Sequence, residues 1–203
     1  MFIDLTLEVT PKLTQDAKGN ESKANFGHLG THFDVMNKEF PLSYLERNGV
    51  IFDVRGIDEI EVIDLEKIRS GDFVIFYTGF LEKAGYGTKE YFQAHPQLSN
   101  NLIEKLLDKK VSIIGIDCAG IRRGKEHTPM DQYCADHNAF VVENLDNLES
   151  LLMQNEFTII NRVFCNGKNS RPPTKTGGCC VGAAETRLCA VLPLKNYCRK
   201  SAE

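Results

Sequence analysis

The chain has 203 residues, of which 42% are apolar and 26% charged, so it is long enough to bury a core and short enough to form one domain. Its net charge of -4 lacks the basic excess that nucleic-acid binding requires, which excludes nucleic acid as an expected partner. No apolar run approaches the roughly 20 residues that span a bilayer, and the first residues lack a signal-peptide pattern. We therefore expect a soluble cytoplasmic protein with no membrane partner.

The predicted elements mix strands and helices. Several apolar runs are nearly continuous in Val, Ile and Phe, as in strands covered on both faces, and two segments have leucines at helical spacing. In chain order, the sequence predicts strands within 2–9, 49–54 and 73–80, a helix in 99–110, strands within 111–120 and 139–145, a helix in 143–154 and a strand at 188–194. This order indicates an α/β fold.

The seven cysteines give an odd number and form no CxxC motif. Five of them lie between Cys165 and Cys198. This pattern favours reduced thiols in a cytosol over a disulfide framework.

The stretch GHLGTHFDV at residues 27–35 places two histidines and an aspartate close together. Imidazole and carboxylate groups are ligands of zinc and manganese. In an extended chain His28, His32 and Asp34 share one face, although the histidine Cα atoms would lie about 13 Å apart. Gly30 can bend the backbone and shorten that gap. A polar face of an edge strand has the same pattern, so spacing alone leaves metal binding and a solvated strand as alternatives.

A second group of polar residues follows the strand predicted to end at Asp117. It contains His127, Asp131 and Glu143, and the carboxyl ends of strands are where α/β folds place their chemistry. Glu143 lies in the apolar run AFVVENL, where a buried carboxylate needs a partner or a metal. The alternative is that Glu143 begins a helix and favours its dipole. Asp117 itself is more typical of a structural turn.

These motifs resemble a known family. HLGTHFD is similar to the HxGTHxD signature of the cyclase family of metal-dependent hydrolases, which includes bacterial kynurenine formamidase and isatin hydrolase. The resemblance extends to FIDLT, YTG, IGID and VVENLDNL, and covers about residues 1–160. It implies a single compact domain over 1–203 of the swivelling β/β/α type, with a mixed central sheet or barrel-like core. The Cys- and Gly-rich segment from about 161 to 203 is atypical of the family.

The resemblance also implies a homodimer that binds a divalent metal, zinc or alternatively manganese. His28, His32, Asp34 and Glu143 match ligand positions of the family. The position of a further family histidine ligand is Asp131 here, which offers oxygen instead of nitrogen. The family's acid/base histidine is absent here. Lys38 is an even number of positions from the signature residues, so in an extended chain it would lie on their face.

We therefore expect a hydrolase of a small-molecule substrate, a formamide or cyclic amide, that acts through metal-activated water. The metal would be held by His28, His32, Asp34, Asp131 and Glu143, and protons would be moved by Lys38 or His127. One alternative is a non-catalytic descendant that keeps metal or ligand binding. Another is an interaction protein whose polar cluster is a solvated strand face.

Overall fold

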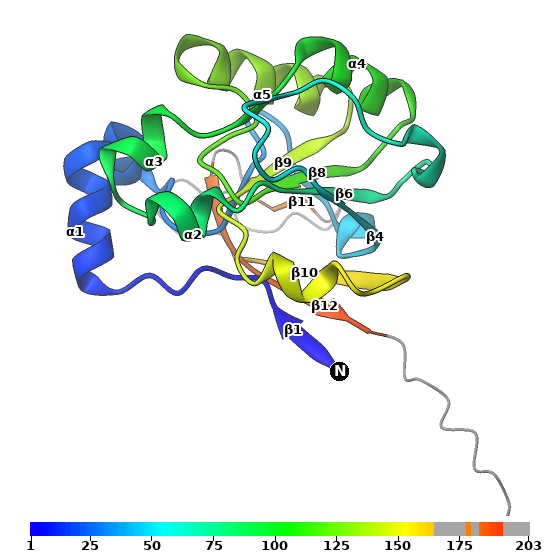
Figure 1. Cartoon of the computed structure of the whole chain (residues 1–203), viewed down its shortest axis with the longest axis horizontal. Helices are drawn as coiled ribbons and strands as arrows, with labels where there is room; N and C mark the ends of the chain where they lie inside the picture. Colours follow the sequence, from blue (N-terminus) through cyan, green and yellow to red (C-terminus); the bar gives the residue numbers. More distant parts are fainter. Residues whose placement is uncertain (165–177, 180–182, 193–203) are drawn as a thin grey trace, which may run out of the picture.

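The structure is a computed structural model that describes residues 1–164, 178–179 and 183–192. Its centre is a mixed sheet in the order β1-β12-β10-β4-β6-β8-β9-β2, and β12 also pairs with β2 (Figure 1). The sheet therefore curls back on itself into a barrel-like core, which confirms the expected α/β fold. Its strands are β1 (Phe2–Asp4), β2 (His32–Asp34), β4 (Glu46–Asp53), β6 (Phe73–Tyr77), β8 (Ile113–Ile116), β9 (Phe140–Glu143), β10 (Phe157–Phe164) and β12 (Ala183–Val191).

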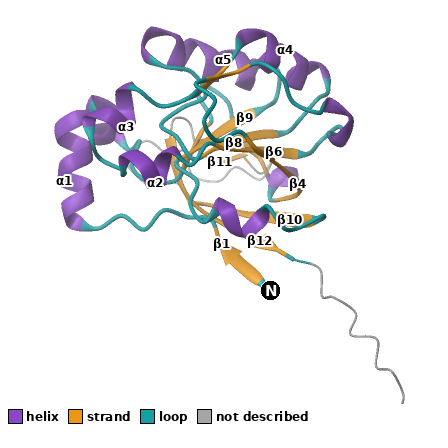
Figure 2. Cartoon of the chain, in the orientation of Figure 1, coloured by secondary structure: helices purple, strands orange, loops and turns teal. Residues whose placement is uncertain are grey.

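Helices and short strand pairs surround this sheet. Figure 2 shows α4 and α5 along one face, with α1, α2 and α3 gathered towards one end. The α-helices are α1 (Pro11–Asn20), α2 (Phe80–Ala84), α3 (Lys89–Gln93), α4 (Asn100–Asp108) and α5 (His127–Asp136). The 3-10 helices are η1 (Ser22–Phe26), η2 (Leu42–Tyr44), η3 (Leu65–Lys67), η4 (Gly124–Glu126) and η5 (Leu148–Leu151). Two small pairs join β3 (Phe40–Pro41) to β11 (Gly178–Cys179) and β5 (Glu59–Ile60) to β7 (Gln97–Leu98).

The parallel strands β4, β6, β8 and β9 form the middle of the sheet, and every residue of β6, β8 and β9 is buried. In β6, Phe73 and Ile75 belong to the core cluster enclosed by the curled sheet. Val74 and Phe76 alternate with them and pack in the cluster that includes the apolar face of α4. Two-sided burial explains the nearly continuous apolar sequence of this strand.

One of the two predicted helices is present in the structure, and the prediction of the other is wrong. α4 begins after Ser99, whose hydroxyl accepts a hydrogen bond from Leu102 N, and its periodic apolar residues are buried. In 143–154, however, the structure has only η5. Asn144 and Asn147 adopt left-handed backbone with φ of 57° and 56°, which interrupts an α-helix before it can form. Leu145, Leu148 and Leu151 are nevertheless buried, although no α-helix joins them.

The sequence also missed several elements, including α1 and α5, whereas the extended geometry expected around His32 and Asp34 is present as β2. No helix in the described part of the chain is long and apolar enough to cross a membrane. The Cys-rich segment falls partly on residues 165–177, 180–182 and 193–203, which lie outside the described residues.

Candidate metal centre

Strands β2 and β9 place the first polar side chains opposite each other. They pair antiparallel, with His32 in register with Glu143 and Asp34 in register with Val141. Phe33, between the two polar residues of β2, belongs to the core enclosed by the sheet. His32 and Asp34 therefore share the other face, on which Glu143 also lies, because alternate residues of a strand point to opposite sides. His32 Nε2 is 3.6 Å from Glu143 Oε2 and 3.8 Å from Asp34 Oδ2.

His28 reaches the same face from outside the strand. Gly30 has φ of 64°, so the chain bends between the two histidines instead of staying extended. His28 Nδ1 then lies 3.2 Å from His32 Nε2 and 3.2 Å from Asp34 Oδ1. The bend expected at Gly30 is present, and it brings the two imidazoles together.

Helix α5 contributes two further side chains. His127 and Asp131 lie one turn apart, and Asp131 is on the buried face of the helix. His127 Nε2 is 3.1 Å from Asp131 Oδ2 and 2.8 Å from Glu143 Oε1. Helix α5 thus brings residues from the second predicted group to the signature residues of β2.

The cluster has the donor set of a cation site. The side chains form two groups, and within each group the donor atoms all lie within 4.8 Å of one another; Asp34 belongs to both groups. Asp34, Asp131 and Glu143 are each no more than 3% exposed. In each of these carboxylates one oxygen has no hydrogen-bond partner, and His127 Nε2 lacks an aligned partner despite its short distances. A buried carboxylate oxygen without a hydrogen-bond partner is costly, and a cation bound among these oxygens would remove that cost. The residues therefore fit a divalent metal. The two groups are His28, His32 and Asp34, and Asp34, His127, Asp131 and Glu143.

The electrostatics of the cluster reflect burial and crowding. Burial raises the pKa of Asp131 to about 7. Burial acts in the same direction on Asp34, but the hydrogen bond to His28 and the charge of His32 hold the pKa of that carboxyl well below its usual range. Burial alone would lower the pKa of His127, whereas the nearby charges of Glu143 and Asp131 raise it to about 11. Without a metal, the cluster therefore holds a proton on His127 at neutral pH.

Hydrogen bonds outside the cluster fix its orientation. The carbonyl oxygen of Gly30 accepts from His32 Nδ1 at 2.8 Å and from Asn144 Nδ2 at 2.8 Å. Tyr91 donates its hydroxyl to Asn144 Oδ1 at 2.7 Å, and Thr31 donates to the Asn144 carbonyl at 2.6 Å. A donating Nδ1 leaves the lone pair of His32 Nε2 facing the carboxylates, as a metal ligand requires.

The cluster opens into a cleft of about 600 Å³. His28, His32, His127 and Glu143 line it, so both predicted groups contribute to its wall. The rest of the wall comes from η1, α3 and the segment before α5, and includes Glu21, Ser22, Lys23, Phe92, Gln93, Ala119, Arg123, Gly124 and Asn144. Sequence reasoning missed Lys23, Arg123 and Asn144, since none belongs to a ligand-spacing motif.

Lys38 lies outside the metal cluster and is not among the residues that line the cleft. Lys38 would share the face of His32 and Asp34 only if the backbone stayed extended. However, β2 ends at Asp34, and the chain turns at Met36, which has φ of 54°. Its ammonium forms a 2.7 Å ion pair with the exposed Asp136. Asp117 is a buried turn residue, as expected, because its carboxylate accepts hydrogen bonds from the backbone of Thr78 and Gly79.

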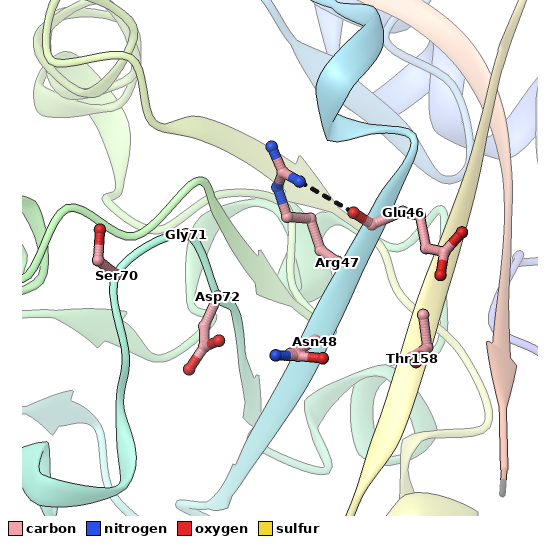
Figure 3. Close-up of a pocket in the computed structure, with 7 residues that line it drawn as sticks. All are labelled: Glu46, Arg47, Asn48, Ser70, Gly71, Asp72 and Thr158. Atoms are coloured by element: carbon pink, nitrogen blue, oxygen red, sulfur yellow. Dashed lines mark hydrogen bonds between the residues drawn. The ribbon is translucent and has the colours of Figure 1, made fainter.

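A second hollow lies at the opposite end of the parallel strands, where β4 and β6 begin (Figure 3). Arg47 donates to the Glu46 carbonyl oxygen at 3.0 Å and to Ser112 Oγ at 3.1 Å. Asp72 accepts from Arg69 N at 2.8 Å. Arg47 and Asp72 are thus held by their neighbours, and none of the residues that line this hollow belongs to the metal cluster.

The curled α/β sheet gathers histidines and carboxylates beside the end of a parallel strand, in an arrangement that could hold a metal ion. The sequence model of the Cyclase family matches residues 3–122, and the chain belongs to this family. No curated protein matches the chain.

Solved structures show the same fold. A predicted metal-dependent hydrolase from Bacillus stearothermophilus is 20% identical with a TM-score of 0.57, over 94% of this chain and 97% of that one. Isatin hydrolase A from Ralstonia solanacearum is 15% identical with a TM-score of 0.66, over 95% of this chain and 92% of that one. Isatin hydrolase A from Labrenzia aggregata, bound to benzyl benzoate, is 15% identical with a TM-score of 0.62, over 95% and 94%.

Proposed function

We propose that the protein is a metal-dependent hydrolase of a small amide, a formamide or a cyclic amide. The observation that carries the proposal is the convergence of histidines with three buried carboxylates beside one cleft, whose wall includes three of the histidines and Glu143. A carboxylate cluster of this kind is costly unless it holds a cation. Hydrolase relatives of similar fold support the same class of reaction.

In this proposal His28, His32, Asp34, Asp131 and Glu143 hold a divalent metal. The mixed nitrogen and oxygen donors suit zinc, and the three carboxylates also suit manganese. When bound, such an ion supplies Lewis acidity that polarises a carbonyl and lowers the pKa of water. The Gly30 carbonyl orients His32 by accepting its Nδ1 proton, so that Nε2 is free to bind.

His127 is the group that we assign to proton transfer. The residue lines the cleft, and its buried Nε2 lies 2.8 Å from Glu143 Oε1, within the distance over which a proton passes between two groups. Hydrolysis adds water to the amide carbon, breaks the bond from carbon to nitrogen and leaves the nitrogen with an added proton. His127 would hold that proton and release it to the leaving nitrogen. Lys38 has no role in this proposal, because its ammonium is paired with Asp136 away from the cleft.

The substrate class is an inference from the hydrolase relatives and from the size of the cleft. A volume of about 600 Å³ suits a small molecule. The proposal also includes a cytoplasmic homodimer, which sedimentation of the purified chain and fractionation of cells would test.

Metal content and turnover together test the proposal. Protein purified without an affinity-metal step should contain near-stoichiometric zinc or manganese by mass spectrometry, and His32→Ala should lose it. The control is His137→Ala, because His137 is exposed and lies outside the cluster. The wild-type protein should also hydrolyse formanilide or isatin. Metal without turnover of either amide would favour a non-catalytic binding protein, and absence of metal from the wild type would overturn the proposal.

A further inference from the structure

We propose that Lys23 selects amide substrates that carry a carboxylate, which makes it a specificity residue of the cleft. This inference rests on the proposed hydrolase function and narrows its substrate class. It follows from the position of Lys23, from the lack of a charge partner and from the chemistry of the opposite wall.

Lys23 lies on η1, at the wall of the same cleft that His28 and His127 line. Its ammonium donates a 3.0 Å hydrogen bond to Thr128 Oγ1, and Thr128 directly follows His127 on α5. The side chain thus reaches across from η1 to the helix that supplies the metal cluster.

The charge of Lys23 is not neutralised by a neighbouring acid. No carboxylate in the described part of the chain forms an ion pair with it, and its one side-chain partner there is the neutral hydroxyl of Thr128. Glu21 lies on the same wall, but its carboxylate accepts from Lys23 N at 2.9 Å and from Ser22 Oγ at 3.3 Å. An accessible ammonium whose side-chain partner is a neutral hydroxyl retains the capacity to bind an anion.

The second cation of the cleft has a partner of its own. Arg123 lines the same cleft and donates to Asp58 Oδ2 at 3.1 Å. Its other terminal nitrogen donates to Asp58 Oδ1 at 3.3 Å, so the charge of Arg123 is already paired with a carboxylate. Lys23 therefore offers the more available positive charge among the described residues of the cleft.

These features define a substrate with two polar groups. The amide carbonyl of the substrate belongs at the metal cluster. The carboxylate of the substrate does not, because the carboxylates of the protein would repel it there. An anionic group of the same molecule belongs beside Lys23, with Phe92 as an apolar part of the wall. A neutral amide of the same size would leave the ammonium without a counter-charge and lose that interaction.

Paired probe substrates test the inference on the zinc-loaded full-length chain. The probes are 2-formamidobenzoate and formanilide, which differ by one carboxylate. We expect Lys23→Met to lower kcat/KM for 2-formamidobenzoate by about tenfold and to change it less than twofold for formanilide. Lys23→Arg should restore most of the preference. The matched control is Lys18→Met, an exposed lysine of α1 that does not line the cleft.

An equal loss on both probes would overturn the inference and leave Lys23 as a tie between η1 and α5. A wild-type enzyme with no preference for the carboxylate would overturn it as well. If neither probe is hydrolysed, the proposed function fails separately, and calorimetry with benzoate and benzamide on metal-free protein decides the inference. Benzoate binding that Lys23→Met abolishes would support it. Equal binding of benzoate and benzamide, or no binding of benzoate to the wild type, would overturn the inference.

Discussion

His32 and Asn144 are joined through one atom, the carbonyl oxygen of Gly30, which lies 2.8 Å from His32 Nδ1 and 2.8 Å from Asn144 Nδ2. Asn144 directly follows Glu143, so one short segment supplies a cluster carboxylate and also fixes the loop that aims a cluster imidazole. The left-handed backbone of Asn144, with φ of 57°, turns its amide back towards that loop. The two halves of the candidate metal centre are therefore held together by hydrogen bonds to the Gly30 carbonyl oxygen. These bonds use neither His32 Nε2 nor the Glu143 carboxylate, the atoms that would bind the metal.

Asn144→Ala should weaken metal binding although Asn144 is not expected to be a ligand. Loss of its amide frees the Gly30 carbonyl and relaxes the orientation of His32, and such supporting residues are typically worth about 10- to 100-fold in metal affinity. Competition with a coloured chelator would measure the change in zinc affinity. The control is Tyr91→Phe, which removes one hydrogen bond to Asn144 Oδ1 and leaves Asn144 Nδ2 on Gly30. Unchanged affinity in Asn144→Ala would contradict the positioning role.

Much of the candidate site was accessible from sequence because it depends on local rules. The alternation of a strand places His32 and Asp34 on one face, and the structure has that arrangement in β2. The cost of burying a carboxylate singled out Glu143, which is 3% exposed in the structure. Gly30 was recognised as a bend, and its positive φ brings His28 back to His32.

The remaining features depend on contacts between distant segments, which local patterns do not encode. Lys23 reaches the cleft because η1 lies beside α5, and its partner Thr128 is 105 positions away in the chain. The wrong helix in 143–154 has a similar cause. Its leucines have helical spacing, but the buried hydrogen bonds of Asn144 to Tyr91 and Gly30 fix a left-handed residue at the start of that segment. Tertiary contacts overrode a local periodicity.

Gly30→Ala should destabilise both the fold and the metal centre. A Cβ at this position would lie 2.7 Å from Val9 Cγ2, and the φ of 64° is strained for any residue with a side chain. We expect a loss of about 1–3 kcal/mol in the free energy of unfolding, measured by urea denaturation. Gly19→Ala is the matched control, because Gly19 lies in α1 with open space around its Cβ and should be neutral or slightly stabilised. Equal effects of the two substitutions would contradict the role assigned to the bend.

His95 should make the protein less stable as the pH falls below neutrality. It is 1% exposed, its Nδ1 lies 2.8 Å from the Pro96 carbonyl oxygen, and burial lowers its pKa from 6.5 to about 4. Between these values the unfolded chain binds a proton at His95 that the folded protein does not, so stability is present above pH 6.5 and lost towards pH 4. The contribution is at most about 3 kcal/mol. His95→Asn keeps a donor for Pro96 and should flatten the dependence of the unfolding midpoint on pH, whereas an unchanged slope would assign the effect to other groups.

His127→Ala separates the two roles that its position allows. Its Nε2 lies 2.8 Å from Glu143 Oε1 and 3.1 Å from Asp131 Oδ2, at the edge of the cluster that lines the cleft. If His127 carries the proton, the variant should keep near-stoichiometric metal and lose about 100-fold or more in kcat on the amide that the wild type hydrolyses. Asp131→Ala is the companion variant, because Asp131 is assigned to the metal and its removal should lower metal content. Loss of metal from His127→Ala to the extent seen in His32→Ala would instead make His127 a ligand, and the proton carrier would then have to be sought elsewhere on the cleft wall.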